Sequence, residues 1–172
     1  LSRPPFSLGE LDMRSTLLIA ALALGYSFTA RPPISPGARS VDPCTLLTAS
    51  EVSAALSITS LPGRPFLGSK NVCYYAADTG FDGTKPSVTL MVMNTAAYEG
   101  QARMGGSLAA HPVSGVGDAA YRVGSGSYVK VVVRKGSGAF SVTVVPGQNS
   151  KATPDQVEQI EEALARKVAA RL

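Results

Sequence analysis

Three strand-like runs separated by short glycine turns constrain the fold of this chain most strongly. They cover residues 119–123, 127–134 and 139–145, and each turn has the form Gly-Ser-Gly. Alternation of β-branched and polar residues predicts strands, and glycine turns of this length join antiparallel neighbours. The runs therefore predict an antiparallel meander with one face in the core and one face in water.

Two further strands are expected earlier in the chain, at residues 72–76 and 87–93. The second run is apolar on both faces, which favours a central position in a sheet. Residues 95–108 form a weaker helix candidate that is interrupted by Gly105-Gly106.

Two stronger helices are marked by capping boxes. Thr48 with Glu51 begins one, and Thr153 with Gln156, around Pro154, begins the other. The last helix carries an apolar stripe at spacings of three and four, with acidic residues in its first half and basic residues in its second. We predict an α+β fold: an antiparallel sheet of about five strands with two main helices packed on one face.

The first 41 residues do not read as part of this fold. We interpret residues 1–12 as an upstream extension and residues 13–27, a basic start followed by an apolar run, as a signal peptide. Residues 28–41 form a proline-rich linker, and residues 42–172 form a single α+β domain. The apolar run is too short to anchor the mature chain in a membrane, so we expect a secreted or periplasmic protein. A buried helix in a cytosolic protein is the alternative.

The only two cysteines, Cys44 and Cys73, both lie in the predicted exported part. In an oxidising compartment an even pair is typical of a disulfide, and the ligands are too few for a zinc site. We predict a structural disulfide between them.

The sequence supplies no catalytic motif. The single histidine, His111, has no nucleophile or acid beside it in a known pattern. A Gly-x-Gly-x-x-Ala match at residues 115–120 precedes a strand instead of a helix, which excludes a dinucleotide site. The loop at residues 78–83 lacks the bidentate glutamate of a calcium loop. We expect no enzyme activity, no metal and no cofactor.

Nucleic acid is excluded as a partner by the charge pattern. The net charge is +4, and the basic residues are scattered and match no nucleic-acid-binding motif. Tyrosine and cationic side chains on a half-wet sheet could instead contact another partner. The predicted binding surface consists of Tyr75, Tyr121, Arg122, Tyr128, Lys130 and Arg134.

Residues 43–52 (Pro-Cys-Thr-Leu-Leu-Thr-Ala-Ser-Glu-Val), Cys73-Tyr74 and residues 113–121 (Val-Ser-Gly-Val-Gly-Asp-Ala-Ala-Tyr) carry a family resemblance. The pattern resembles a group of bacterial exported domains of unknown function, many of them actinobacterial-type cell-envelope lipoproteins. The resemblance implies envelope placement, an α+β fold and a Cys44–Cys73 bridge, and it supplies no activity. Lipoprotein members carry a cysteine directly after the apolar run, whereas the first cysteine here is Cys44. We therefore expect release into the periplasm or medium.

Together these patterns predict a non-catalytic, monomeric exported domain that binds an unknown envelope protein. A carrier of a small ligand or lipid is the alternative, suggested by the two-sided apolar run at residues 88–93 and its methionines. An enzyme with an unrecognised site is the second alternative. Contact of His111 with Asp118 or Glu99 would favour that reading.

Overall fold

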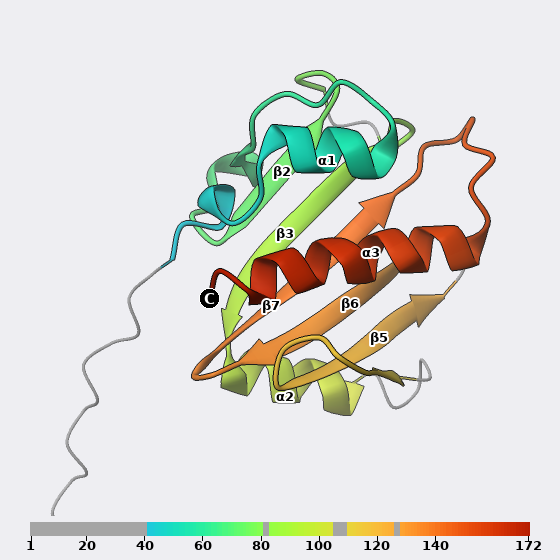
Figure 1. Cartoon of the computed structure of the whole chain (residues 1–172). Coiled ribbons are helices and arrows are strands. Elements are labelled where there is room, and N and C mark those ends of the chain that lie inside the picture. Colours follow the sequence, from blue (N-terminus) through green and yellow to red (C-terminus); the bar gives the residue numbers. More distant parts are fainter. Residues whose placement is uncertain (1–40, 81–82, 105–109, 126–127) are drawn as a thin grey trace, which may run out of the picture. The chain divides into compact units, whose positions relative to one another are not determined.

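An antiparallel sheet forms the framework of the molecule (Figure 1). In the described part of the chain its strand order is β1-β2-β3-β7-β6-β5-β4. The strands are β1 (Arg64–Pro65), β2 (Val72–Ala76), β3 (Ser87–Asn94), β4 (His111–Val113), β5 (Ala119–Ser125), β6 (Tyr128–Lys135) and β7 (Gly138–Val145). The α+β class and the antiparallel sheet are confirmed.

The expected number of about five strands is wrong, because the described sheet has seven. The two missed strands, β1 and β4, lie at its edges and have only two and three residues. Both contain a proline, Pro65 or Pro112, which removes a ladder donor and is tolerated at a sheet edge. Strands this short show no readable alternation.

The computed structural model of the chain describes residues 41–80, 83–104, 110–125 and 128–172. The predicted extension, the predicted signal peptide and the linker up to residue 40 lie outside these ranges. So do residues 81–82, in the loop compared above with a calcium loop, and Gly105-Gly106.

Both predicted capping boxes are present. Thr48 Oγ1 accepts the Glu51 N–H at 3.2 Å while Glu51 Oε2 accepts the Thr48 N–H at 3.0 Å, and this pair begins α1 (Ala49–Leu56). Thr153 and Gln156 exchange the same two bonds at the start of α3 (Pro154–Ala169). A further helix, α2 (Thr95–Met104), follows β3 directly, and short 3-10 turns η1 and η2 span Pro43–Thr45 and Phe66–Gly68.

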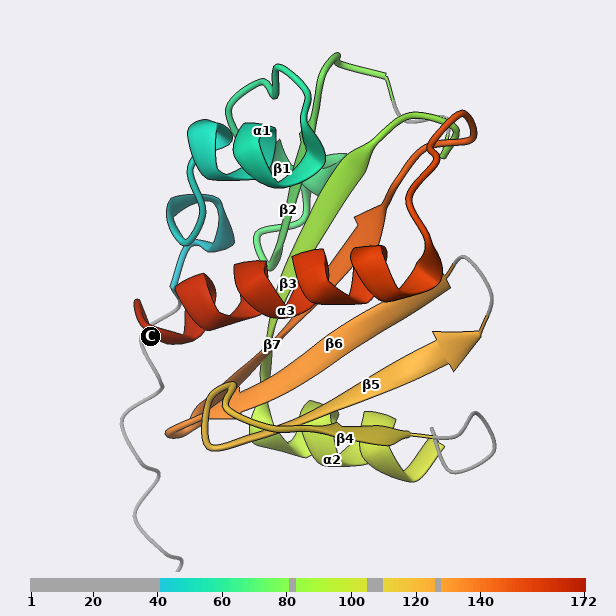
Figure 2. The same ribbon diagram turned by 45° about the vertical axis from the view of Figure 1, so that its right-hand side comes forward.

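The main core lies between the sheet and the helices α1 and α3. Figure 2 shows α3 crossing the central strands on the same side of the sheet as α1. We call this side the front face. The side chains that meet there include Val52 of α1, Leu164 and Val168 of α3, and Leu90 and Val142 of the sheet, all of them buried. Because successive strand residues point to opposite faces, the alternate residues form the back face.

A smaller cluster lies on the back face, where α2 packs. Tyr121, Val123 and Val132 are buried there, with Tyr98 and Ala102 of α2 packed against them. The helix α2 therefore covers part of the back face: it lies close to β3, β7 and β6, and its side chains also contact β5.

Candidate functional site

Charge is distributed unevenly in the sheet. The described strands contain the cations Arg64, Arg122, Lys130, Arg134 and Lys135 and no aspartate or glutamate. Strand alternation places Arg122 and Lys135 on the front face and the other three on the back face. Any carboxylate that neutralises these cations must therefore come from a helix, a loop or another molecule.

The two front-face cations are neutralised within the chain. The Arg122 guanidinium binds Glu158 at 2.9 Å and Glu162 at 2.7 Å, both on α3. Lys135 Nζ lies 3.1 Å from Asp118 Oδ1, in the turn before β5. The Gly136 N–H also donates to Asp118, and together these bonds lower the pKa of that carboxyl.

The back-face cations differ, because no ion pair joins them to a carboxylate among the described residues. Arg64 donates to the Asp78 carbonyl at 3.1 Å, and its guanidinium lies 5.3 Å from the centre of the Tyr74 ring. Lys130 and Arg134 are half-buried on β6. Burial lowers the pKa of Lys130, because loss of hydration disfavours its charged form.

Cross-strand register aligns these cations with hydroxyl groups. One row across five neighbouring strands reads Tyr74, Thr89, Thr143, Lys130 and Val123, and Arg64 extends it onto β1. The two threonines are half-buried, as is Met91 in the next row. We define the basic row as the three back-face cations Arg64, Lys130 and Arg134 with the two threonines Thr89 and Thr143; Arg134 lies on β6 four residues outside the cross-strand register.

Standard sheet spacing gives the size of the basic row. Lys130 and Arg64 are separated by four strand spacings, or about 19 Å, and Arg134 lies four residues along β6 from Lys130, about 13 Å away. The distance across the strands, with the hydroxyl groups of Thr89 and Thr143 between Arg64 and Lys130, suits an extended segment of a few residues. Along β6 the back-face residue between Lys130 and Arg134 is Val132, which is buried under α2, so Arg134 is separated from Lys130 by a covered position.

The structure divides the predicted binding residues between the two faces. Tyr121, Lys130 and Arg134 belong to the back face, whereas Tyr75 and Arg122 belong to the front face. Tyr128 begins β6 in register with Ser125, and its side chain lies outside the described part. The six residues therefore do not share one surface.

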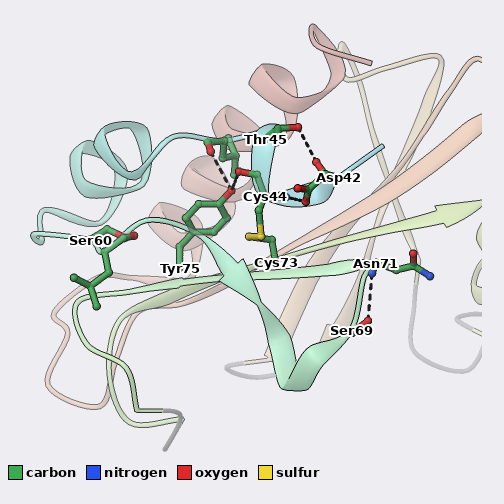
Figure 3. The surroundings of a disulfide bond; sticks show 10 residues. Asp42, Cys44, Thr45, Ser60, Ser69, Asn71, Cys73 and Tyr75 are labelled. Carbon is green, nitrogen blue, oxygen red and sulfur yellow. Dashed lines mark hydrogen bonds between the residues drawn. A yellow bond between two sulfur atoms is a disulfide. The ribbon is translucent and has the colours of Figure 1, made fainter. Parts of the chain in front are cut away.

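Two of the tyrosines are structural instead of exposed. Tyr75 is fully buried, and its hydroxyl donates to the carbonyl oxygens of Leu47 at 3.0 Å and Cys44 at 3.3 Å (Figure 3). Burial raises its pKa to about 12. Tyr121 is buried beneath α2, where its hydroxyl donates to the Tyr98 carbonyl at 3.0 Å. The prediction that both tyrosines lie on an exposed binding surface is wrong. The sequence pattern of a strand does not show which of its two faces other elements will cover.

The predicted disulfide is confirmed. Cys44 and Cys73 are bonded, with their Cα atoms 5.1 Å apart, and the bond joins η1 to β2 (Figure 3). Tyr75, two residues along β2, points to the same side and holds the chain around Leu47. The disulfide and the Tyr75 hydrogen bonds together attach residues 43–47 to the front face of the sheet, and we call this region the disulfide corner.

The contact expected of a histidine-based site does not form. His111 begins β4 and is exposed, in register with Arg122. Asp118 pairs with Lys135, and Glu99 pairs with Arg103 at 3.5 Å. Within the described ranges, no group of three or more His, Cys, Asp or Glu side chains is arranged to hold a metal ion. The same ranges contain no helix that is long and apolar enough to span a bilayer.

Comparison of the chain with protein-family models, with curated proteins and with solved structures found no significant match. The family resemblance in the sequence therefore stays a prediction, and functional inference rests on the geometry of the chain itself.

Proposed function

We propose that the chain is an exported, non-catalytic binding module that holds an acidic polypeptide segment of an envelope protein on its basic row. One observation carries the proposal. The strands contain no carboxylate, and the back-face cations Lys130 and Arg134 have no carboxylate partner in the described part of the chain, whereas the front-face cations are neutralised.

The energetics favour an anionic partner at Lys130. A half-buried ammonium group has already lost part of its hydration, so an incoming carboxylate displaces little water and restores a charge-assisted hydrogen bond. Thr89 and Thr143 add hydroxyl donors in the same row. Met91, half-buried beside them, offers apolar contact for a partner side chain.

A polypeptide suits this surface better than a lipid headgroup does. Lys130 and Arg64 are ~19 Å apart across the strands, which matches carboxylates spaced along an extended segment. A membrane surface is instead bound by dense basic clusters with apolar residues that insert. The Cys44–Cys73 disulfide supports export, because such bonds persist in oxidising compartments.

Fluorescence anisotropy with a dye-labelled peptide of three Glu-Val repeats, ~20 Å long when extended, tests the proposal. We expect Lys130→Gln and Arg134→Gln each to weaken binding about fivefold, which corresponds to about 1 kcal/mol. The two effects should add, because the residues lie well apart. Lys151→Gln, the same change at an exposed lysine outside the basic row, should leave the affinity unchanged.

Two results would overturn the proposal. One is equal binding of the matching Lys-Val peptide, since the basic row should repel it. The other is binding to vesicles of anionic phosphatidylglycerol with no binding to the acidic peptide, which would assign the surface to a membrane.

A further inference from the structure

Glu161 is a fully buried carboxyl group in the main core. Its exposed fraction is 0%, although it belongs to α3, whose other glutamates reach solvent. The registered pairing of β6 with β7 ends at Lys130 and Thr143, and the next N–H, that of Val144, donates to Glu161 Oε1 at 3.0 Å. Glu161 Oε2 has no hydrogen-bond partner in the described part of the molecule.

The charged groups near Glu161 pair with other residues or are exposed to solvent. Arg122 of β5 is the nearby cation, but its terminal nitrogens bind Glu158 and Glu162, and its buried Nε has no partner among the described residues. His111 of β4 is exposed and stands in register with Arg122. The core residues on the front faces of β6 and β7 are valine and phenylalanine, and the one charged front-face residue in the described part of these strands, Lys135, pairs with Asp118. Glu51 of α1 pairs with Lys167 and Arg171 at the opposite end of α3.

We propose that Glu161 is a proton-controlled latch that fastens the first half of α3 to β7 when its carboxyl group is protonated and releases it when ionised. A neutral carboxyl can remain in an apolar core while its carbonyl oxygen accepts the Val144 N–H. An ionised carboxyl is more stable in water than at this buried position, where one of its oxygens has no hydrogen-bond partner and no cation pairs with it among the described residues. Burial accordingly raises the pKa of Glu161 to about 8.

The surroundings allow a local opening. The side of α3 that carries Gln159, Ile160 and Ala163 borders a hollow of about 670 Å³, which Leu56 of α1 also lines and which Glu161 does not reach. The second half is anchored, since Leu164 and Val168 are buried and the side chain of Arg171, which follows the helix, binds Glu51. Opening is therefore confined to the part of α3 around Glu161.

The direction of the pH effect follows from linkage. In the closed state the pKa of the Glu161 carboxyl is about 8, whereas in the open state it has the ordinary value of 4.5. Between pH 4.5 and pH 8, therefore, the carboxyl is protonated in the closed state and ionised in the open state. The equilibrium constant for opening should therefore increase about tenfold for each pH unit between roughly 5 and 8, and stay constant above that range.

Hydrogen exchange of the Val144 amide in the intact protein tests the latch. After correction for intrinsic exchange, its protection factor should fall about tenfold per pH unit between roughly pH 5 and 8. In Glu161→Gln the fall should disappear, because the introduced amide cannot ionise while its carbonyl can still accept the Val144 N–H. Glu99→Gln, a matched change on the surface of α2, should keep the native profile.

A second measurement needs no variant. NMR titration of the native Glu161 carboxyl should show a midpoint well above the ordinary glutamate value. A midpoint near 4.5 would overturn the latch, and so would an unchanged pH profile for Val144 in Glu161→Gln. The latch is independent of the basic row, so either proposal can fail alone.

Discussion

Arg171, the penultimate residue, forms a two-pronged ion pair with Glu51 in the first turn of α1. Its two terminal nitrogens lie 2.8 and 2.9 Å from the Glu51 oxygens, and one of them also donates to the Leu46 carbonyl at 2.7 Å. The pair joins the C-terminal end of the chain to the disulfide corner. The hydrogen bonds from the Arg171 side chain are the main reason that the pKa of Glu51 is lowered to about 2.

Glu51→Gln should therefore weaken the fold in a pH-dependent way. A carboxyl whose folded pKa is depressed stabilises the protein above its unfolded pKa of 4.5, and this contribution is lost as pH falls towards 2. Because Arg171 is partly exposed, we expect a loss of about 1 kcal/mol at neutral pH. Urea unfolding at pH 7 and pH 3 measures it, and an equal difference between native and variant at both pH values would contradict the assignment.

The disulfide makes a separate prediction. Cys44→Ser and Cys73→Ser should each reduce the free energy of unfolding by roughly 3 kcal/mol, as expected for a loop of this size on the chain-entropy model. The double variant should lose little more than either single variant, because one bond is removed in all three. Strongly additive losses in denaturant titrations would show that the two side chains contribute independently.

Position 63 requires glycine because neighbouring side chains lie too close for a Cβ atom, and not because of its backbone φ angle. A Cβ atom built there would lie 2.5 Å from the Tyr75 ring and 2.7 Å from Cys73 Sγ. Gly63→Ala should therefore destabilise the protein by ~1–3 kcal/mol, since both neighbours are buried. Gly100→Ala is the control: its Cβ would meet nothing within 4 Å, and in a helix alanine should stabilise by up to about 1 kcal/mol. Thermal melts of the two variants that shifted in the same direction would contradict this account.

Elements with local signals were predictable from the sequence. Both capping boxes place helix starts at the correct residue, and the glycine turns separate β5, β6 and β7 as expected. The edge strands β1 and β4 carry no local signal, because they are short and contain proline. Their pairing depends on neighbours that only the fold supplies.

The candidate site was less predictable, because it depends on which side of each strand becomes covered. The alternation of residues in β6 correctly places Lys130 and Arg134 on the face opposite to Val131 and Val133. It does not predict that Tyr75 and Tyr121 are buried, because the elements that cover them are distant in sequence. Glu161 was missed although a signal exists. It stands four residues after Val157 and three before Leu164, on the apolar side of α3.

The binding of an acidic segment to the back face is tested most directly by mapping amide shifts in ¹⁵N spectra during titration with the Glu-Val peptide. We expect the perturbed amides to gather at Thr89, Lys130, Arg134 and Thr143, with little change in α1 or α3. Perturbations confined to the hollow around Leu56 and Ile160, or no perturbation at all, would contradict it.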